Sequence, residues 1–289
     1  MATVLAVDVG GTKLAAGVVG VDGSLTARAS RPTPGAGDAE ELFAAVLEVV
    51  GEVRAGGEAA CGVGCGGPMA LGGEEVSPLN IPGWRGFPLR SRLAAALDLP
   101  VFVDNDAKAL ALGEGWQGAA RGERDFLAMV VSTGVGGGIV LDGRLLDGAA
   151  GNAGHIGHVI VEPDGRTCSC GARGCLEAEA SGTAIAARTG RPAAEASGPE
   201  RERAGALVGR AVASVANLLD LRLAVVAGSV ALGYGDAFFA AAQAELDRSA
   251  RISFSAGARI VPAGLGDAGP LVGAAAVARR ALGHPVGPT

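Results

Sequence analysis

Residues 4–23 read VLAVDVGGTKLAAGVVGVDG, and this stretch decides the fold that we expect for the chain. An apolar run of β-forming residues ends at Asp8 in a Gly-Gly turn, a second apolar run follows, and Asp22-Gly23 supplies a hairpin turn. Residues 126–143, FLAMVVSTGVGGGIVLDG, repeat the order of strand, glycine-rich turn, strand and Asp-Gly turn. The repeat predicts two similar α/β lobes that each open with a β-hairpin.

Outside the two hairpins, the apolar residues predict alternating helices and strands. Asp38 is expected to cap a helix whose apolar positions, from Leu42 to Val53, recur at helical spacing. Further helices are expected at 89–97, from Asp106, at about 204–219, at about 237–248 and from about 271, and further strands at 60–64, 101–103, 223–227 and 259–261. This order of elements is typical of α/β proteins.

We expect the chain to divide into two lobes, for which its 289 residues are sufficient. Residues 1–115, joined by the last helix at about 271–289, are expected to form the N-terminal lobe, and residues 116–270 the C-terminal lobe. Two similar lobes that face each other would bring both glycine-rich turns to one cleft.

The composition excludes several classes of protein. Hydrophobic residues make up 49% of the chain and charged residues 19%, which excludes disorder over most of its length. The net charge of −6 and the lack of a lysine or arginine run argue against nucleic acid and anionic membrane as partners. The apolar runs are short and none follows a basic N-terminal region, so we expect a cytoplasmic protein without signal peptide or membrane span.

The first glycine-rich turn is a candidate phosphate site. Gly10 and Gly11 allow backbone N–H groups to approach an anion. Thr12 adds a hydroxyl donor and Lys13 a cation, while Asp8 at the strand end is able to hold Mg²⁺. For this motif taken alone, an ordinary hairpin turn is an equal alternative.

A second turn, residues 132–138, favours the phosphate interpretation because it offers another row of backbone N–H groups. No stretch of the chain fits the Walker A pattern. Residues 62–67 fit G-x-G-x-x-G, but Pro68 and Gly72-Gly73 follow where a dinucleotide site requires a helix. We expect this loop to shape a small-molecule site, with a plain tight turn as the alternative.

Asp104-Asn105-Asp106 is expected where a strand ends and a helix begins. An N-cap is the common role of an aspartate at such a position. Beside two phosphate turns, however, Asp106 becomes a candidate general base, because a hydroxyl must lose its proton as it attacks phosphorus. Asn105 is able to donate and accept hydrogen bonds with neighbouring sugar hydroxyls.

His158, Cys168, Cys170 and Cys175 have the spacing of a structural zinc site, H-x9-C-x-C-x4-C. Four ligands of this kind complete a tetrahedron with no open position, and a set of free buried thiols is the alternative. The second ring nitrogen of His158 would remain available to a ligand. Glu177 closely follows the last cysteine, and it is either a surface carboxylate or a partner for a sugar hydroxyl.

With these motifs assembled, the chain resembles the ROK family of bacterial sugar kinases and sugar-responsive repressors, and in particular its glucokinase-like branch. The resemblance covers nearly the whole chain and rests on DVGGTK at 8–13, SPLNIPGW at 77–84, DNDA at 104–107, STGVGGGI at 132–139, GHIGH at 154–158, CSCGARGCLE at 168–177 and VVAGS at 225–229. It implies a duplicated ribonuclease-H-like fold of the actin-like ATPase class that closes over sugar and Mg-ATP. Homodimers are usual in such proteins.

The resemblance also implies roles for the matching residues. Asp106 becomes the base that acts on the 6-hydroxyl of a hexose, so ATP and Mg²⁺ are expected together with the structural Zn²⁺. The sugar side would comprise Gly67, Asn105, His155, His158 and Glu177, and the nucleotide side would comprise Asp8, Gly10, Gly11, Thr12, Lys13, Thr133, Gly134, Gly136 and, against the adenosine, Gly228.

Two positions depart from the family pattern. His155 stands where the family commonly has a glutamate that contacts the sugar, and Lys108 where it commonly has asparagine. His155 therefore puts glucose in doubt as the preferred substrate, and a kinase for an amino- or N-acyl-hexose is the alternative. A sugar-sensing repressor is the competing class, but the DVGG motif begins at residue 8, which leaves no room for a preceding helix-turn-helix.

Overall fold

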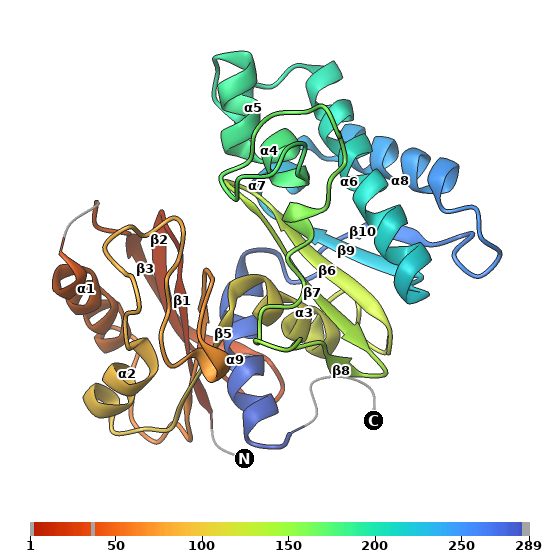
Figure 1. The fold of residues 1–289 in the computed structure, drawn as a ribbon. Coiled ribbons are helices and arrows are strands. Elements are labelled where there is room, and N and C mark those ends of the chain that lie inside the picture. The colour runs from red at the N-terminus through yellow and green to blue at the C-terminus, as the bar shows by residue number, and fades with distance from the viewer. Residues whose placement is uncertain (1–2, 36–37, 285–289) are drawn as a thin grey trace. The chain divides into compact units, whose positions relative to one another are not determined.

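The computed structural model describes residues 3–35 and 38–284 and contains two compact units (Figure 1). Unit 1 comprises Met1–Gly122, Leu145–Ala153 and Gly264–Thr289, and unit 2 comprises Glu123–Arg144 and Gly154–Ala263. The lobe boundaries expected from the sequence stay a prediction, because compactness alone does not show that a unit folds by itself.

Unit 1 is built on a five-stranded sheet with the order β3-β2-β1-β4-β5. Its strands are β1 (Val4–Val9), β2 (Lys13–Val19), β3 (Leu25–Pro32), β4 (Cys61–Cys65) and β5 (Val101–Asn105). β1 pairs antiparallel with β2, while β1, β4 and β5 run parallel. Because carboxyl ends of parallel strands meet at one edge, Asp8, Gly64 and Asp104 lie side by side in register there.

Helices cover both faces of this sheet. α1 (Ala39–Gly51) and α2 (Leu89–Leu97) share one apolar core with the strands, and this core includes the fully buried Trp84. α9 (Gly269–Ala281) packs on β1 and β4 from the other face, and α3 (Asp106–Gln117) packs on α9. Gly62 permits this contact, because a Cβ there would lie 1.9 Å from the carbonyl oxygen of Ala274.

Unit 2 repeats the plan with a sheet of order β10-β9-β6-β7-β8. Its strands are β6 (Phe126–Val131), β7 (Val135–Leu141), β8 (Arg144–Leu145), β9 (Leu223–Ala227) and β10 (Arg259–Pro262), and its helices are α4 (Leu176–Ala180), α5 (Gly182–Thr189), α6 (Gly198–Leu219), α7 (Ser229–Tyr234) and α8 (Asp236–Ser249). α6 and α8 pack against each other, and the unit's apolar core joins them to β6 and β9.

The predicted repeat of strand, turn and strand is confirmed, since β1–β2 and β6–β7 both pair antiparallel and each continues into a parallel neighbour. One expectation is wrong. The second glycine-rich turn does not extend over 132–138, because β7 begins at Val135. Gly137 lies inside this strand, where a Cβ would come within 2.9 Å of the Gly154 carbonyl oxygen, so close packing explains this glycine.

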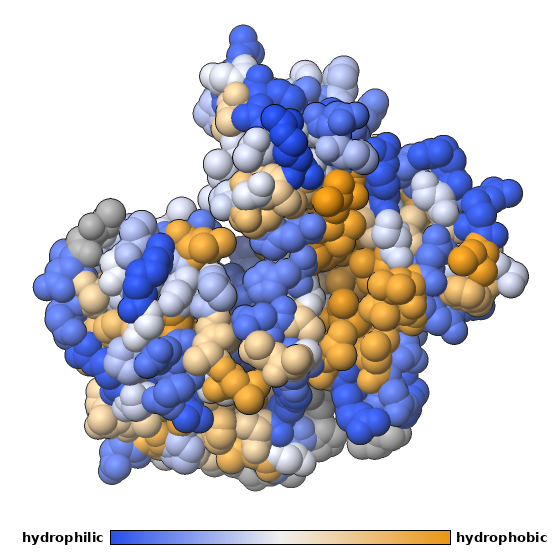
Figure 2. All heavy atoms as spheres, in the orientation of Figure 1, coloured by the Kyte–Doolittle hydropathy of each residue, from blue (hydrophilic) through white to orange (hydrophobic). Residues whose placement is uncertain are grey.

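Among the described residues, no helix is both long and apolar enough to cross a membrane. Figure 2 shows a face that is mostly hydrophilic, with apolar residues gathered over the strands of unit 2. The formal net charge of −6 is that of the whole chain and does not refer to this face alone.

Candidate active site

The first glycine-rich turn joins β1 to β2 in unit 1. The Gly10 N–H donates to the Lys13 carbonyl oxygen at 3.0 Å, and the Thr33 hydroxyl donates to the Gly10 carbonyl oxygen at 2.7 Å. A Cβ on Gly11 would lie 2.7 Å from Cβ of Asn80, so the turn packs closely on the loop that precedes α2. The outer side of the turn is exposed, as a phosphate site requires.

Asp8 and Asp106 lie on either side of Gly64. A Cβ on Gly64 would be 3.8 Å from Asp8 Oδ1 and 3.6 Å from Asp106 Cα. Burial, with the nearby Asp106 carboxylate as the second cause, raises the pKa of Asp8 to about 7, while Lys13 opposes the shift. A cation bound at Asp8 would favour its ionised form.

Asn105, and not Asp106, caps α3. The Asn105 Oδ1 accepts hydrogen bonds from the N–H groups of Ala107 at 3.0 Å and Lys108 at 3.4 Å. Asp106 is the first residue of the helix, and its own Oδ1 accepts from the Ala107 N–H at 2.8 Å. The interpretation of Asp106 as the N-cap is therefore wrong, and its carboxyl group is oriented by the first turn of the helix.

Gly67 lies in the loop between β4 and α2. Its carbonyl oxygen accepts from the Leu79 N–H at 3.2 Å, so the start of this loop lies against its middle part. The G-x-G-x-x-G pattern at 62–67 opens no helix, because the next α-helix begins at Leu89. The prediction that no α-helix directly follows this pattern is confirmed.

The second turn, in unit 2, consists of Ser132, Thr133 and Gly134. The N–H of Val135 donates to Glu177 Oε2 at 2.9 Å, and a Cβ on Gly134 would lie 2.8 Å from the same oxygen. The Glu177 carboxylate therefore lies against the turn and takes up one of the N–H groups that the sequence offered to a phosphate. Sequence reasoning missed this contact, since the two residues are 42 positions apart.

Gly228 lies between β9 and α7 in the same unit. Its φ is +102°, and a Cβ would lie 2.3 Å from the Val131 carbonyl oxygen, so only glycine fits. The hydroxyl oxygens of Ser132 and Ser229 are 2.9 Å apart. The structure thus brings Gly228 beside the second turn.

The four predicted zinc ligands converge in unit 2. The ligand atoms of His158, Cys168, Cys170 and Cys175 all lie within 4.8 Å of one another, with 3.7 Å between Cys168 Sγ and His158 Nδ1 and 3.7 Å between Cys170 Sγ and Cys175 Sγ. With Zn–S bonds of about 2.3 Å, the edges of a zinc tetrahedron are about 3.8 Å long. Both the kind of donor and the spacing therefore fit zinc.

The His158 and cysteine cluster adjoins other predicted residues of unit 2. Cys175 is the residue before α4, so Glu177 lies in the first turn of that helix. His155 precedes a short 3-10 turn at Ile156–His158, and the ring centroids of His155 and His158 are 6.0 Å apart. The predicted residues thus form one group in each unit.

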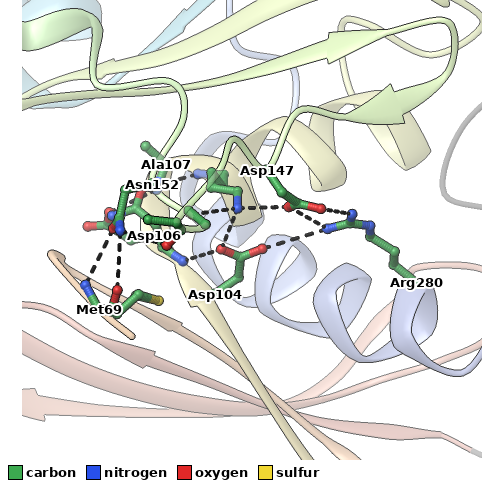
Figure 3. A network of polar contacts seen from close by, with 11 residues as sticks. Met69, Asp104, Asp106, Ala107, Asp147, Asn152 and Arg280 are labelled. Carbon is green, nitrogen blue, oxygen red and sulfur yellow. Dashed lines mark hydrogen bonds and ion pairs between the residues drawn. The ribbon is translucent and has the colours of Figure 1, made fainter. Parts of the chain in front are cut away.

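Sequence reasoning also missed a charged network beside Asp106 in unit 1 (Figure 3). Lys108 Nζ lies 3.0 Å from Asp104 Oδ1 and 3.0 Å from Asp147 Oδ1, and Arg280 pairs with the same Asp147. The sequence shows only the i, i+4 spacing of Asp104 and Lys108, because the other partners are distant along the chain.

Two sheets that each combine an antiparallel hairpin with parallel neighbours define the duplicated ribonuclease-H-like fold of the actin-like ATPase class. The glycine turns, and the aspartates beside Gly64, are groups of the kind that phosphoryl transfer requires. The model of the ROK family matches residues 4–281, and the chain belongs to this family, as the motifs predict.

Relatives with known names support this assignment. The chain is 43% identical to the glucokinase of Thermotoga maritima over 185 residues, which span 63% of this chain and 58% of that protein. It is 38% identical to the N-acetylmannosamine kinase of Escherichia fergusonii over 252 residues, which span 81% of this chain and 85% of that protein. A solved ROK family glucokinase from Streptomyces griseus, in complex with glucose and AMPPNP, has a TM-score of 0.84 and 31% identity, covering 96% of this chain and 99% of that one.

Proposed function

We propose that this protein is an ATP-dependent sugar kinase that phosphorylates the 6-hydroxyl of a hexose. The observation that carries the proposal is the pair Asp8 and Asp106 at the strand ends of unit 1, which both lie beside Gly64 and adjoin the first glycine turn. Phosphoryl transfer to a hydroxyl needs a base and a site for the metal–phosphate group, and this edge of the sheet offers both. The named relatives support a sugar as the acceptor.

Asp106 is the proposed general base. Its carboxylate would accept the proton of the attacking hydroxyl, since it is held at the start of α3 and is not used as the helix cap. The cap occupies the Asn105 side-chain oxygen, which leaves the Asn105 amide nitrogen as the donor to a sugar hydroxyl. Gly67 would contribute backbone from the neighbouring loop.

Mg-ATP would supply the transferred phosphoryl group. Its phosphates would be bound by backbone N–H groups and side chains of the two turns, namely Gly10, Gly11, Thr12, Lys13, Thr133 and Gly134, and by Gly136 at the start of β7. Asp8 would hold Mg²⁺ directly or through water. Gly228, where a side chain would collide with backbone, would lie against the adenosine.

Structural zinc is the proposed occupant of the His158, Cys168, Cys170 and Cys175 cluster. The cluster would hold α4 in place and thereby set the position of Glu177. We infer that Glu177, His158 and His155 contact the sugar. A homodimer in the cytoplasm, where ATP is available, completes the proposal.

Glucose is the first candidate for the sugar. A second candidate, an amino- or N-acyl-hexose, is favoured by one observation, which is the histidine at position 155. The similarity to an N-acetylmannosamine kinase supports the same alternative. In either case the 6-hydroxyl and the base at Asp106 are unchanged.

The experiment is an assay of ADP release with a panel of hexoses and amino-hexoses, carried out on the wild type and on Asp106→Asn. The variant keeps the shape of the side chain and loses proton acceptance, so we expect turnover to fall roughly 10²–10⁴-fold while sugar affinity stays within about tenfold. Asp22→Asn, an exposed aspartate of the same unit, is the matched control and should retain turnover. Near-native turnover of Asp106→Asn would refute the assignment of the base.

A further inference from the structure

Lys108 is a buried cation in an unfavourable position. Its side chain is only 3% exposed, and it lies in the first turn of α3, where the helix dipole disfavours a positive charge. A lysine at such a position requires strong partners. The three N–H donors of an ammonium group find them in Asp104 Oδ1 at 3.0 Å, Asp147 Oδ1 at 3.0 Å and the Gly151 carbonyl oxygen at 3.1 Å.

Two of these three partners belong to the segment Leu145–Ala153. This segment is part of unit 1, although the chain before and after it belongs to unit 2. Arg280 of α9 adds a bidentate pair with Asp147, at 3.2 Å and 2.6 Å. The segment is therefore fastened to α3 and α9 by charged side chains, and the two cations balance Asp104 and Asp147.

The fastened segment carries Asn152, which binds the loop that contains Gly67. Asn152 Nδ2 donates to the Met69 carbonyl oxygen at 3.2 Å, and Asn152 Oδ1 accepts from the Met69 N–H at 3.4 Å (Figure 3). One amide side chain thus satisfies both backbone groups of Met69. A shift of the segment would move this loop or break both hydrogen bonds.

The other end of the network reaches the catalytic segment. Asp104 Oδ1, which binds Lys108, also accepts from the N–H of Asn105 at 2.8 Å. The residues that are proposed to bind the sugar from unit 1, Gly67 and Asn105, are therefore both supported by groups that Lys108 joins.

We propose that Lys108 is a positioning residue for sugar binding, which acts through Asp147 and Asn152 on the loop around Met69. The inference rests on the proposed sugar kinase function, and it adds the device that fixes the unit 1 part of the sugar site. Lys108 itself touches neither sugar nor nucleotide in this proposal.

The first test is hydrogen exchange, which does not depend on activity. Lys108→Met keeps the length of the side chain and removes its positive charge. Asp147→Asn keeps the shape of the side chain and removes the negative charge that pairs with Lys108. In both variants we expect amides of 145–153 to exchange about tenfold faster or more, with no change in α1. Arg92→Met, which breaks an ion pair with Glu40 in the same unit, is the control and should leave 145–153 unchanged. Unchanged hydrogen exchange of residues 145–153 in Lys108→Met would show that Lys108 does not hold this segment in place.

The second test is kinetic. We expect the KM for the sugar to rise on the order of tenfold in Lys108→Met and Asp147→Asn, with kcat and the KM for ATP nearly unchanged, because a displaced loop weakens sugar placement and leaves the base intact. The effect of the double variant should be smaller than the sum of the two single effects, because both substitutions remove the shared Lys108–Asp147 contact. Lys108→Arg should partly restore the KM, and it serves as the folded charge-bearing variant if Lys108→Met fails to fold.

The outcomes separate the two proposals. Faster exchange with an unchanged sugar KM would show a purely structural lysine and overturn the positioning role. Fully additive effects of Lys108→Met and Asp147→Asn would overturn the role of their shared contact. A wild type that phosphorylates no hexose would overturn the proposed function and the positioning role with it, while the exchange data would still decide whether the segment is fastened.

Discussion

Replacement of Asp8 by asparagine should make the metal-free protein more stable at neutral pH and should make the gain depend on pH. Burial, with the Asp106 carboxylate as the second cause, raises the pKa of Asp8 from 3.8 to about 7. The folded state therefore favours the neutral carboxyl group, and the contribution of Asp8 to stability is fully present below about pH 4. This contribution is lost as the pH rises toward 7, because the unfolded chain releases the proton first.

The magnitude follows from the shift. A difference of about three pKa units, at about 1.4 kcal/mol per unit, corresponds to about 4 kcal/mol between acidic and neutral pH. Asparagine resembles the neutral carboxyl group at every pH. The difference in the free energy of unfolding between Asp8→Asn and the wild type should therefore grow from near zero at about pH 4 to about 4 kcal/mol at about pH 7, and then stay constant.

Urea unfolding followed by tryptophan fluorescence measures this difference. Both tryptophans, Trp84 and Trp116, lie in unit 1, as Asp8 does, so the signal reports the relevant unit. The measurements are made without Mg²⁺ or nucleotide. Asp22→Asn is the control, because Asp22 is exposed and hydrogen bonds from Ser24 lower its pKa. An Asp8→Asn difference that is the same at pH 5 and pH 8 would refute the argument.

Mg²⁺ should reverse the preference of the folded state for the neutral carboxyl group of Asp8. A cation bound at Asp8 favours the ionised carboxylate, so Mg²⁺ binding must displace a proton below about pH 7. The affinity for Mg²⁺ should then fall by up to about tenfold for each pH unit below 7, and Asp8→Asn should lose this dependence.

Three further predictions concern other parts of the molecule. Metal analysis should find one zinc per chain. Cys170→Ser should lose both metal and activity, while Ser169→Ala should keep them. Fully active protein without zinc would contradict the proposal. Glu114→Gln should destabilise unit 1 by about 3 kcal/mol, because the fully buried carboxylate accepts hydrogen bonds from the N–H groups of Ala119, Gly264 and Leu265. A change below about 0.5 kcal/mol in the free energy of unfolding, measured with urea, speaks against this. His155→Glu should move the sugar ranking toward glucose, mainly through KM, since Asp106 is untouched; identical rankings in both proteins show that His155 does not face the sugar.

The sequence predicted what depends on local pattern. The hairpins follow from apolar runs with Asp-Gly turns, and the zinc ligands follow from spacing alone, because a short loop with glycines has few ways to bring thiolates together. The helix start at 105–106 was predicted without its cap, because Asn and Asp are equally good N-caps and a shift of one residue exchanges their roles. The extent of the second turn was overestimated, since a glycine that permits close packing in a strand cannot be distinguished from one in a turn.

The contacts that the sequence could not predict are those that tie the site to distant parts of the chain. Glu177 reaches the second turn across 42 residues, and Arg280 reaches Asp147 across 133. Each of these pairs depends on the arrangement of several elements at once, so no periodicity or motif records it. They are also the contacts that hold loops, and loops carry most of the proposed binding groups. The residues that perform the chemistry are thus readable from motifs, whereas the residues that hold them in position become visible only in the folded structure.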